Sequence, residues 1–408
     1  MRPTCEDGRV STTSQERGPR LTAVMREGER VTPLELFFDL VFVLALTQCT
    51  TLMVRMPTWV GLLKGVLVLG MLWWAWVGYA WLTSVLDPEE GSVRLVIFAA
   101  MAAMLVAALC VPGAFGSEAL LFACAYALVR SAHIALFTIA SREDPALRHS
   151  VAGLAYSTAI GAGLLFVAAF TGGALQLGLW GLALVLDAGG PYLFGADGWK
   201  LVPGHFAERH GLIVLIALGE SIVALGVGAR TTITADAVIA AVLGVIVAAT
   251  LWWVYFDVTA LVAERRLSNT EEGRERNELA RDSYSYLHFP MVVGIALLAV
   301  GLKVTLEGAG DPLKLVPTVA LLGGTATYLL AHVAFRLRNV RSLSGRRLVC
   351  AIVLLVLVPI TLALKISSLA TLAILAALLS LLILYEVTRY ADMRERVRHQ
   401  GSPTGPPR

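Results

Sequence analysis

Residues 34–54 read LELFFDLVFVLALTQCTTLMV and form the first of several long apolar runs in the chain. A transmembrane helix needs about 20 predominantly apolar residues, so this run is long enough to cross a bilayer. Its only charged residues are Glu35 and Asp39, which lie four positions apart and therefore on one face of a helix. The run predicts a membrane-spanning helix that carries two carboxyl groups near its start.

Similar runs follow along the chain, and turn signals such as Asp87-Pro88 and Gly310-Asp311-Pro312 separate most of them. These runs comprise residues 60–86, 93–111, 118–140, 151–170, 175–194, 211–229, 237–262, 287–306, 315–335, 348–366 and 369–385. Together with the first run, they predict an all-α polytopic membrane protein with about twelve transmembrane helices.

The composition excludes a soluble globular protein. Of the 408 residues, 57% are hydrophobic and 15% are charged, and mean hydropathy is +0.72. Soluble domains contain about one quarter charged residues. The net charge of +3 is small, and the five cysteines show no Cys-x-x-Cys spacing. We therefore expect the lipid bilayer as a partner, and no cofactor, metal ion or nucleic acid.

Lysine and arginine are concentrated in the termini and in alternate loops, which favours the cytoplasmic side for these segments. The basic residues outside these segments are Arg55, Lys64, Arg130, Arg230, Lys303, Lys314 and Lys365. We therefore expect a multi-pass protein of the cell membrane with both termini in the cytoplasm. Its parts are a cytoplasmic polar segment at 1–33, a first six-helix half at 34–194, a cytoplasmic linker at 195–210, a second six-helix half at 211–385 and a cytoplasmic, partly disordered tail at 386–408.

Three motifs recur in the same order in the two halves. Glu35 followed by Thr47-Gln48 corresponds to Glu208 followed by Glu220-Ser221, Trp73-Trp74-Ala75-Trp76 to Trp252-Trp253-Val254-Tyr255, and Ala132-His133 to Ala331-His332. Because six is even, both halves enter the membrane from the same side, and the motifs predict two parallel six-helix repeats. Parallel repeats are a transporter architecture with sites at the repeat interface. Convergent use of Trp-Trp and Ala-His pairs is the alternative.

These motifs also resemble a known family. The opening ELFFDLVFV at 35–43 with Thr47-Gln48, and Glu208-Arg209-His210-Gly211 leading into LGESI at 218–222, are similar to two signatures of the bacterial low temperature requirement protein A family. The resemblance covers roughly residues 30–390, and His210 stands where an aromatic residue is common. It implies a bacterial membrane protein with a role in growth in the cold, and no settled biochemical activity.

Polar side chains inside the predicted spans are the candidate functional residues. Burying a charged side chain in a membrane costs free energy, and such residues are typical of functional sites. The substrate- or proton-binding candidates are Asp39, Arg130, His133, Asp187, Glu220, Ser221, Asp257 and His332. A motif at helix entrances adds Glu35, Gln48, Glu208, Arg209 and His210. From depth along the helices, we expect Glu220 near the membrane midplane and Arg130 paired with Glu220 or Asp39. Gly189-Gly190-Pro191 should break its helix after Asp187.

Three function classes remain open at this point. The chain has no phosphate-binding Gly-x-x-x-x-Gly-Lys loop, no Gly-x-Ser-x-Gly elbow and no His-Glu-x-x-His motif. The leading hypothesis is a secondary or proton-coupled transporter of a small solute, which the repeat and the intramembrane charges favour. The alternatives are a structural or regulatory membrane protein that supports growth in the cold, whose buried charges glue helices together, and a membrane-embedded enzyme acting on a lipid-linked substrate.

Overall fold

The computed structural model describes residues 30–89, 91–195, 197–228, 234–389 and 391. Within these residues there are twelve helical spans long and apolar enough to cross a membrane, and no strand. The expected all-α, multi-pass architecture is therefore confirmed. The predicted N-terminal polar segment up to residue 29 and the predicted tail from residue 392 onward lie outside the described residues.

Fifteen α-helices and three shorter helical segments make up the described chain. The helices are α1 (Pro33–Arg55), α2 (Trp59–Thr83), α3 (Gly91–Cys110), α4 (Ala119–Ala140), α5 (Pro145–Ala168), α6 (Gly173–Leu193), α7 (Pro203–Gly228), α8 (Ala235–Phe256), α9 (Thr259–Ser268), α10 (Arg274–Ala280), α11 (His288–Glu307), α12 (Leu315–Thr318), α13 (Gly324–Val340), α14 (Gly345–Ala363) and α15 (Ser368–Arg389). The segments are a 3₁₀ turn, η1 (Val111–Gly113), and two π-helical stretches, η2 (Arg281–Tyr286) and η3 (Val319–Gly323).

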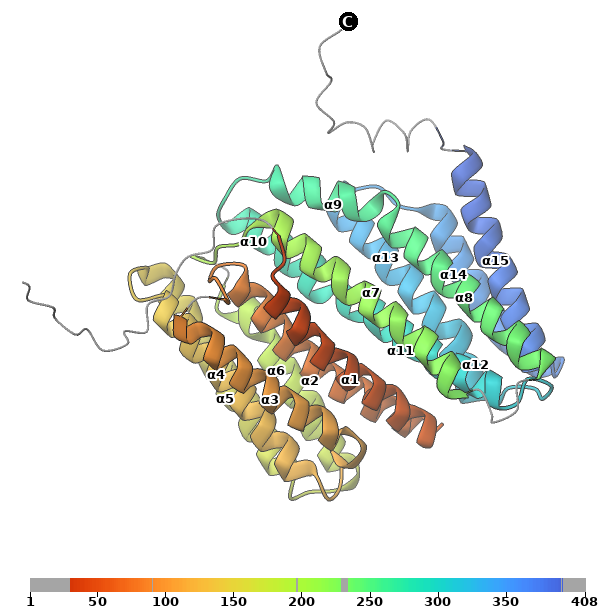
Figure 1. Ribbon diagram of the computed structural model, residues 1–408, viewed down its shortest axis with the longest axis horizontal. Coiled ribbons are helices and arrows are strands. Elements are labelled where there is room, and N and C mark those ends of the chain that lie inside the picture. The colour runs from red at the N-terminus through yellow and green to blue at the C-terminus, as the bar shows by residue number, and fades with distance from the viewer. Residues whose placement is uncertain (1–29, 90, 196, 229–233, 390, 392–408) are drawn as a thin grey trace, which may run out of the picture.

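The helices form two groups that lie side by side, α1–α6 and α7–α15 (Figure 1). In the first group α1 packs against α2 and α3, α3 against α4, α4 against α5, and α2 and α5 against α6. In the second, α7 packs against α8 and α11, α11 against α13, α13 against α14, and α8 and α14 against α15. Contacts of α1 with α7 and α11 join the groups. Helices from both groups therefore line the central interface.

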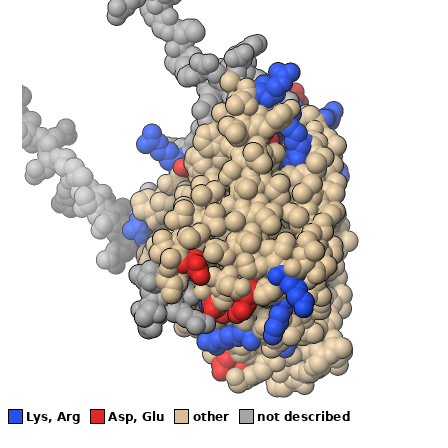
Figure 2. All heavy atoms as spheres, turned by 90° about the vertical axis from the view of Figure 1, so that its right-hand side faces the viewer, with Lys and Arg blue, Asp and Glu red and all other residues tan. Residues whose placement is uncertain are grey.

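The outer surface is suited to lipid. On the face drawn in Figure 2, charged side chains gather near the top and in the lower part, with a band of uncharged side chains between them. Large apolar side chains are exposed on the peripheral helices, including Leu95, Val242, Val349 and Leu384. In water such a surface would be unfavourable, so these side chains face the hydrocarbon core of a bilayer.

Two local expectations differ from the structure. Helix α7 begins at Pro203 rather than at Gly211, so Glu220 lies further along its helix than the midplane depth predicted for it. Helix α6 does not break at Gly189-Gly190-Pro191 but continues to Leu193. The proline lies in the last turn, where it removes a single backbone hydrogen bond.

Side chains of a neighbouring segment bond to the backbone near the end of α6. The Tyr286 hydroxyl donates to the Ala188 carbonyl, and an Arg281 guanidinium nitrogen donates to the Pro191 carbonyl at 3.3 Å. Both donors come from η2, where the charged segment between α8 and α11 ends. That segment forms α9 and α10, and Arg274 pairs with Glu278 at 2.8 Å.

The second group is held closely by glycines where α11 crosses the α12–η3–α13 segment. A Cβ atom at Gly294 would lie 2.6 Å from the backbone nitrogen of Tyr328, and one at Gly301 would lie 2.6 Å from Cα of Leu321. Neither position has room for a side chain, because real Cβ contacts are longer than 3.0 Å. Small residues that let backbones approach are typical of helix packing in membranes.

Candidate functional site

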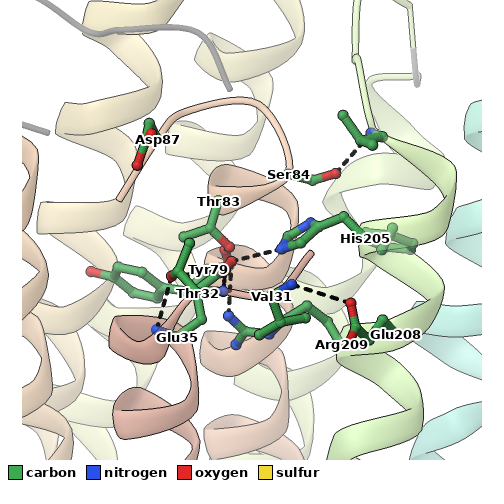
Figure 3. A network of polar contacts seen from close by, with 12 residues as sticks. Val31, Thr32, Glu35, Tyr79, Thr83, Ser84, Asp87, His205, Glu208 and Arg209 are labelled. Atoms are coloured by element: carbon green, nitrogen blue, oxygen red, sulfur yellow. Dashed lines mark hydrogen bonds and ion pairs between the residues drawn. The ribbon is translucent and has the colours of Figure 1, made fainter. Parts of the chain in front are cut away.

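A buried network of charges joins α1 to α7 where both helices begin (Figure 3). Glu35 Oε1 lies 2.9 Å from Nε2 of His205 and 3.1 Å from Nη1 of Arg209. Nη2 of Arg209 lies 2.7 Å from Oδ1 of Asp39, which also accepts a hydrogen bond of 2.8 Å from the indole of Trp76 on α2. All five side chains are buried. The network thus links three helices from the two groups.

Local structure explains how α1 holds its two carboxylates. Thr32 caps the helix, and its backbone N–H donates to Oε2 of Glu35 at 2.8 Å, which completes a capping box. Asp39 follows one turn later on the same face. The arginine of α7 then reaches both carboxylates with different nitrogens of its planar guanidinium, a geometry that lysine does not provide.

Glu220 lies further along the same pair of helices. Its Oε1 lies 2.8 Å from the Thr50 hydroxyl, and its Oε2 lies within hydrogen-bonding distance of the Thr47 hydroxyl, both on α1. Its side chain is almost fully buried. Among the described residues, no lysine or arginine forms an ion pair with this carboxyl group. Glu220 therefore differs from the other buried carboxylates, each of which meets an arginine.

A second charged cluster lies within the first group of helices. Nη2 of Arg130 on α4 lies 2.8 Å from Oδ1 of Asp187 on α6, and Thr158 on α5 bonds to both partners at 2.7 Å. The Tyr126 hydroxyl donates to the other Asp187 oxygen. Nη1 of Arg130 lies 3.4 Å from Nδ1 of His133. The prediction that Arg130 pairs with Glu220 or Asp39 is therefore wrong.

The second group contains a comparable cluster. His332 on α13 lies 3.0 Å from Nη1 of Arg347 on α14. Arg347 binds Glu386 on α15 through two nitrogens, at 2.9 and 2.7 Å. In each group, a buried histidine therefore contacts an arginine whose partner is a carboxylate on the last helix, Asp187 or Glu386.

The remaining predicted residues lie around these clusters without joining them. His210 is buried, bonds to the Phe206 carbonyl at 2.9 Å and packs edge-on against Trp76. Glu208 is exposed and accepts a hydrogen bond of 3.1 Å from the Val31 backbone. Three others complete the set: the buried Ser221, the half-buried Gln48 on α1 and the half-buried Asp257 at the end of α8.

Several residues of the clusters were missed in the sequence. His205 falls in the segment 195–210, where the charges of Glu208 and Arg209 hide the first turns of α7 from an apolar window. Arg347 belongs to a run of basic residues typical of a membrane-surface anchor, and Glu386 lies in the predicted tail. Thr50 could have been identified from the sequence, because it follows Thr47 by three positions and therefore lies on the same face of the helix.

A narrow cavity of about 40 Å³ lies beside the Arg130 cluster. Its lining residues are Trp74, Val77, Gly78, Trp81, Arg130, His133, Leu154, Pro191, Trp199, Asn277, Arg281 and Ser285. A volume of this size holds roughly three water molecules. Neither Asp39 nor Glu220 lines it, so the intramembrane charges form separate centres and not one ring.

Comparison with known proteins places the chain in a family. A family model described as bacterial low temperature requirement A protein (LtrA) matches residues 30–384. An uncharacterised protein of Rhizobium meliloti is 30% identical over 279 residues, which cover 65% of this chain and 67% of the relative. No solved structure matches the chain significantly. Because the family match spans both groups of helices and both sequence signatures, the protein belongs to the bacterial low temperature requirement A family.

Proposed function

We propose that this protein is a proton-coupled secondary transporter of a small solute, with Glu220 as the residue that carries the coupled proton. The observation that carries the proposal is the surroundings of Glu220. Its carboxyl group is buried between α7 and α1, and its contacts there are the neutral hydroxyls of Thr47 and Thr50. A buried carboxyl that forms no ion pair in the described structure can exchange a proton without breaking one, and the charge of Lys303 acts on Glu220 without such a pair.

The two threonines suit both protonation states of Glu220. The Thr47 hydroxyl also lies 3.0 Å from the Val43 carbonyl, and the Thr50 hydroxyl 2.9 Å from the Thr47 carbonyl. Each hydroxyl has one proton to donate. When both donate to their own helix, a protonated Glu220 can donate to a hydroxyl oxygen. When both turn toward Glu220, they stabilise its carboxylate. Rotation of two hydroxyl groups therefore accommodates the proton's arrival and departure.

We further propose that the two groups of helices are parallel repeats that move relative to each other during transport. Thr47 and Glu220 occupy corresponding positions of the repeated motif, and they contact each other. Corresponding residues of two repeats meet only beside their symmetry axis. The matched helix packing and the paired histidine–arginine–carboxylate clusters also fit two parallel repeats. Transporters with parallel repeats place their sites at such an interface.

We predict an orientation with both termini in the cytoplasm, since the basic residues favour it. A reporter enzyme fused after Arg408, or inserted between α9 and α10, should report the cytoplasm. One inserted in the segment 113–117 between α3 and α4 should report the outside. Activity of any of the three on the opposite side would overturn the proposed orientation.

The experiment that tests transport is solute flux in proteoliposomes with and without an imposed pH gradient. Purified protein should accumulate at least one small solute only when the gradient is present, and protein-free liposomes should not. Absence of gradient-driven flux across a broad panel of small anionic, cationic and neutral solutes would contradict the proposal.

A structural role is the second candidate, and the ion pairs favour it. Arg130, Arg209 and Arg347 each meet at least one carboxylate within 3.1 Å in the described structure. Paired charges of this kind can hold helices together. On this account, substitutions in the pairs would change stability, and Glu220→Gln would change nothing beyond stability.

A further inference from the structure

The interface between the two groups of helices is charged at one end. In the described structure, the ion pairs between the groups are those of the network that joins α1 to α7, in which Arg209 lies 3.1 Å from Glu35 and 2.7 Å from Asp39 (Figure 3). Near the same end, the indole of Trp81 on α2 donates to the Ser285 hydroxyl in η2 at 2.9 Å. Charges and hydrogen bonds therefore hold this end of the interface together.

The opposite half of the same interface has a different character. A rise of about 1.5 Å per residue places Thr50 about 16 Å beyond Asp39 along α1. At this level the groups meet through the hydroxyl contacts of Glu220 and through apolar contacts, such as the cluster that contains Met53 of α1 and Val300 of α11. Lipid tails are as apolar as these side chains. This half can therefore separate without breaking an ion pair, whereas the end with the network cannot.

From this asymmetry we infer that the network between α1 and α7 is a gate that closes the cytoplasmic side of the protein. The inference rests on the proposed function, and the side follows from the predicted orientation. The gate is closed in this structure, since Glu35, Asp39 and Arg209 are at most 2% exposed. Transporters with repeats expose their site by moving one repeat against the other. Separation of α1 from α7 at the network gives Glu220 a path to the cytoplasm, by which its proton leaves.

Two native cysteines can report the opening of this gate. Cys49 lies on α1 between the two threonines that contact Glu220, it is fully buried, and the charge of Glu220 acts on its thiol. Cys110 is almost as deeply buried, but it lies on α3 within the first group. Opening of the gate should expose Cys49 alone, whereas general loosening of the protein should expose both thiols.

The test is modification of the full-length protein in inside-out membrane vesicles by trimethylammonium-ethyl methanethiosulfonate, a thiol reagent that does not cross membranes. Mass spectrometry follows the modified fraction of each cysteine with time. Glu35→Gln removes one charge and leaves Arg209 paired with Asp39, so the variant should fold. Modification of Cys49 should become at least about tenfold faster, because a contact to a charged group changes a population by that factor. Modification of Cys110 should not change.

Glu208→Gln is the matched control, because Glu208 is an exposed carboxylate on α7 outside the network. In this variant Cys49 should react as in the original protein. Asp39→Asn serves as a second gate variant if Glu35→Gln fails to fold, and it should show the same acceleration. Unchanged modification of Cys49 in the folded gate variants, or an equal acceleration at Cys110, would overturn the gate and leave a network that only holds helices together.

The measurement separates the gate from transport, because it needs no solute. Accelerated modification of Cys49 without any solute flux would refute transport alone. Solute flux with unchanged modification of Cys49 in the gate variants would refute the gate alone. Reagent added to right-side-out vesicles should not modify Cys49 faster in the gate variants, and acceleration from that side only would contradict a cytoplasmic gate.

Discussion

Arg209→Leu is expected to destabilise the protein by at least about 3–5 kcal/mol, because it leaves uncompensated charge buried at the interface between the two groups of helices. The guanidinium contacts Glu35 at 3.1 Å and Asp39 at 2.7 Å, and all three side chains are almost fully buried. Asp39 would retain only the Trp76 indole among the partners described. The midpoint of thermal unfolding in detergent, together with the yield of folded protein, measures the effect.

Two companion variants sharpen this result. Arg209→Lys keeps the charge but loses the fork that reaches both carboxylates, so its midpoint should fall between those of the original protein and Arg209→Leu. Arg274→Leu removes an exposed ion pair on α10, and the midpoint should not change. If Arg209→Leu unfolds at the same temperature as the original protein, the network does not join the two groups as described.

Asp187→Ala is the second substitution with a large expected effect, a loss of about 3–5 kcal/mol. The substitution leaves the positive charge of Arg130, whose side chain is 1% exposed, without its carboxylate partner. It also removes the oxygens that accept hydrogen bonds from Tyr126 and Thr158. A double-mutant cycle with Arg130→Leu separates the ion pair from the other contacts.

The double variant should recover much of the lost stability, because removal of both charges leaves no buried ion. Strictly additive losses in the two single variants would contradict the pairing of Arg130 with Asp187, and so would a single Asp187→Ala variant as stable as the original protein.

The architecture could be predicted because each span is set locally. A run such as residues 34–54 is long and apolar enough by itself to require a helix across the membrane, whatever its neighbours are. The family could be predicted for a similar reason, since its signatures are contiguous stretches, and the match over residues 30–384 confirms the resemblance. The beginning of α7 could not be predicted. Its first turns contain His205, Glu208 and Arg209, which are typical of a polar linker.

The pairing of charges could not be derived from depth. The position of a residue along its helix gives only its depth in the membrane. Several helices carry carboxylates at similar depths, so depth alone does not identify the partner of Arg130. The partner is then decided by lateral packing, which places Asp187 rather than Asp39 or Glu220 beside Arg130. Tyr126, Arg130 and His133 on α4 are buried together, because their spacing in the sequence places them on one face of the helix.

The proposal that Glu220 carries a coupled proton is tested most directly by Glu220→Gln in proteoliposomes. Glutamine keeps one acceptor oxygen and a donor amide, so it can bond to Thr47 and Thr50 as a protonated carboxyl would. The variant should therefore fold normally and should still exchange solute across the membrane when solute is present on both sides. Accumulation of solute against its gradient in response to a pH gradient should be lost.

Glu143→Gln, which alters an exposed carboxylate between α4 and α5, is the control and should accumulate solute as the original protein does. Solute exchange retained and pH-driven accumulation abolished in Glu220→Gln is the predicted result. Full pH-driven accumulation by a stable Glu220→Gln protein would contradict the account.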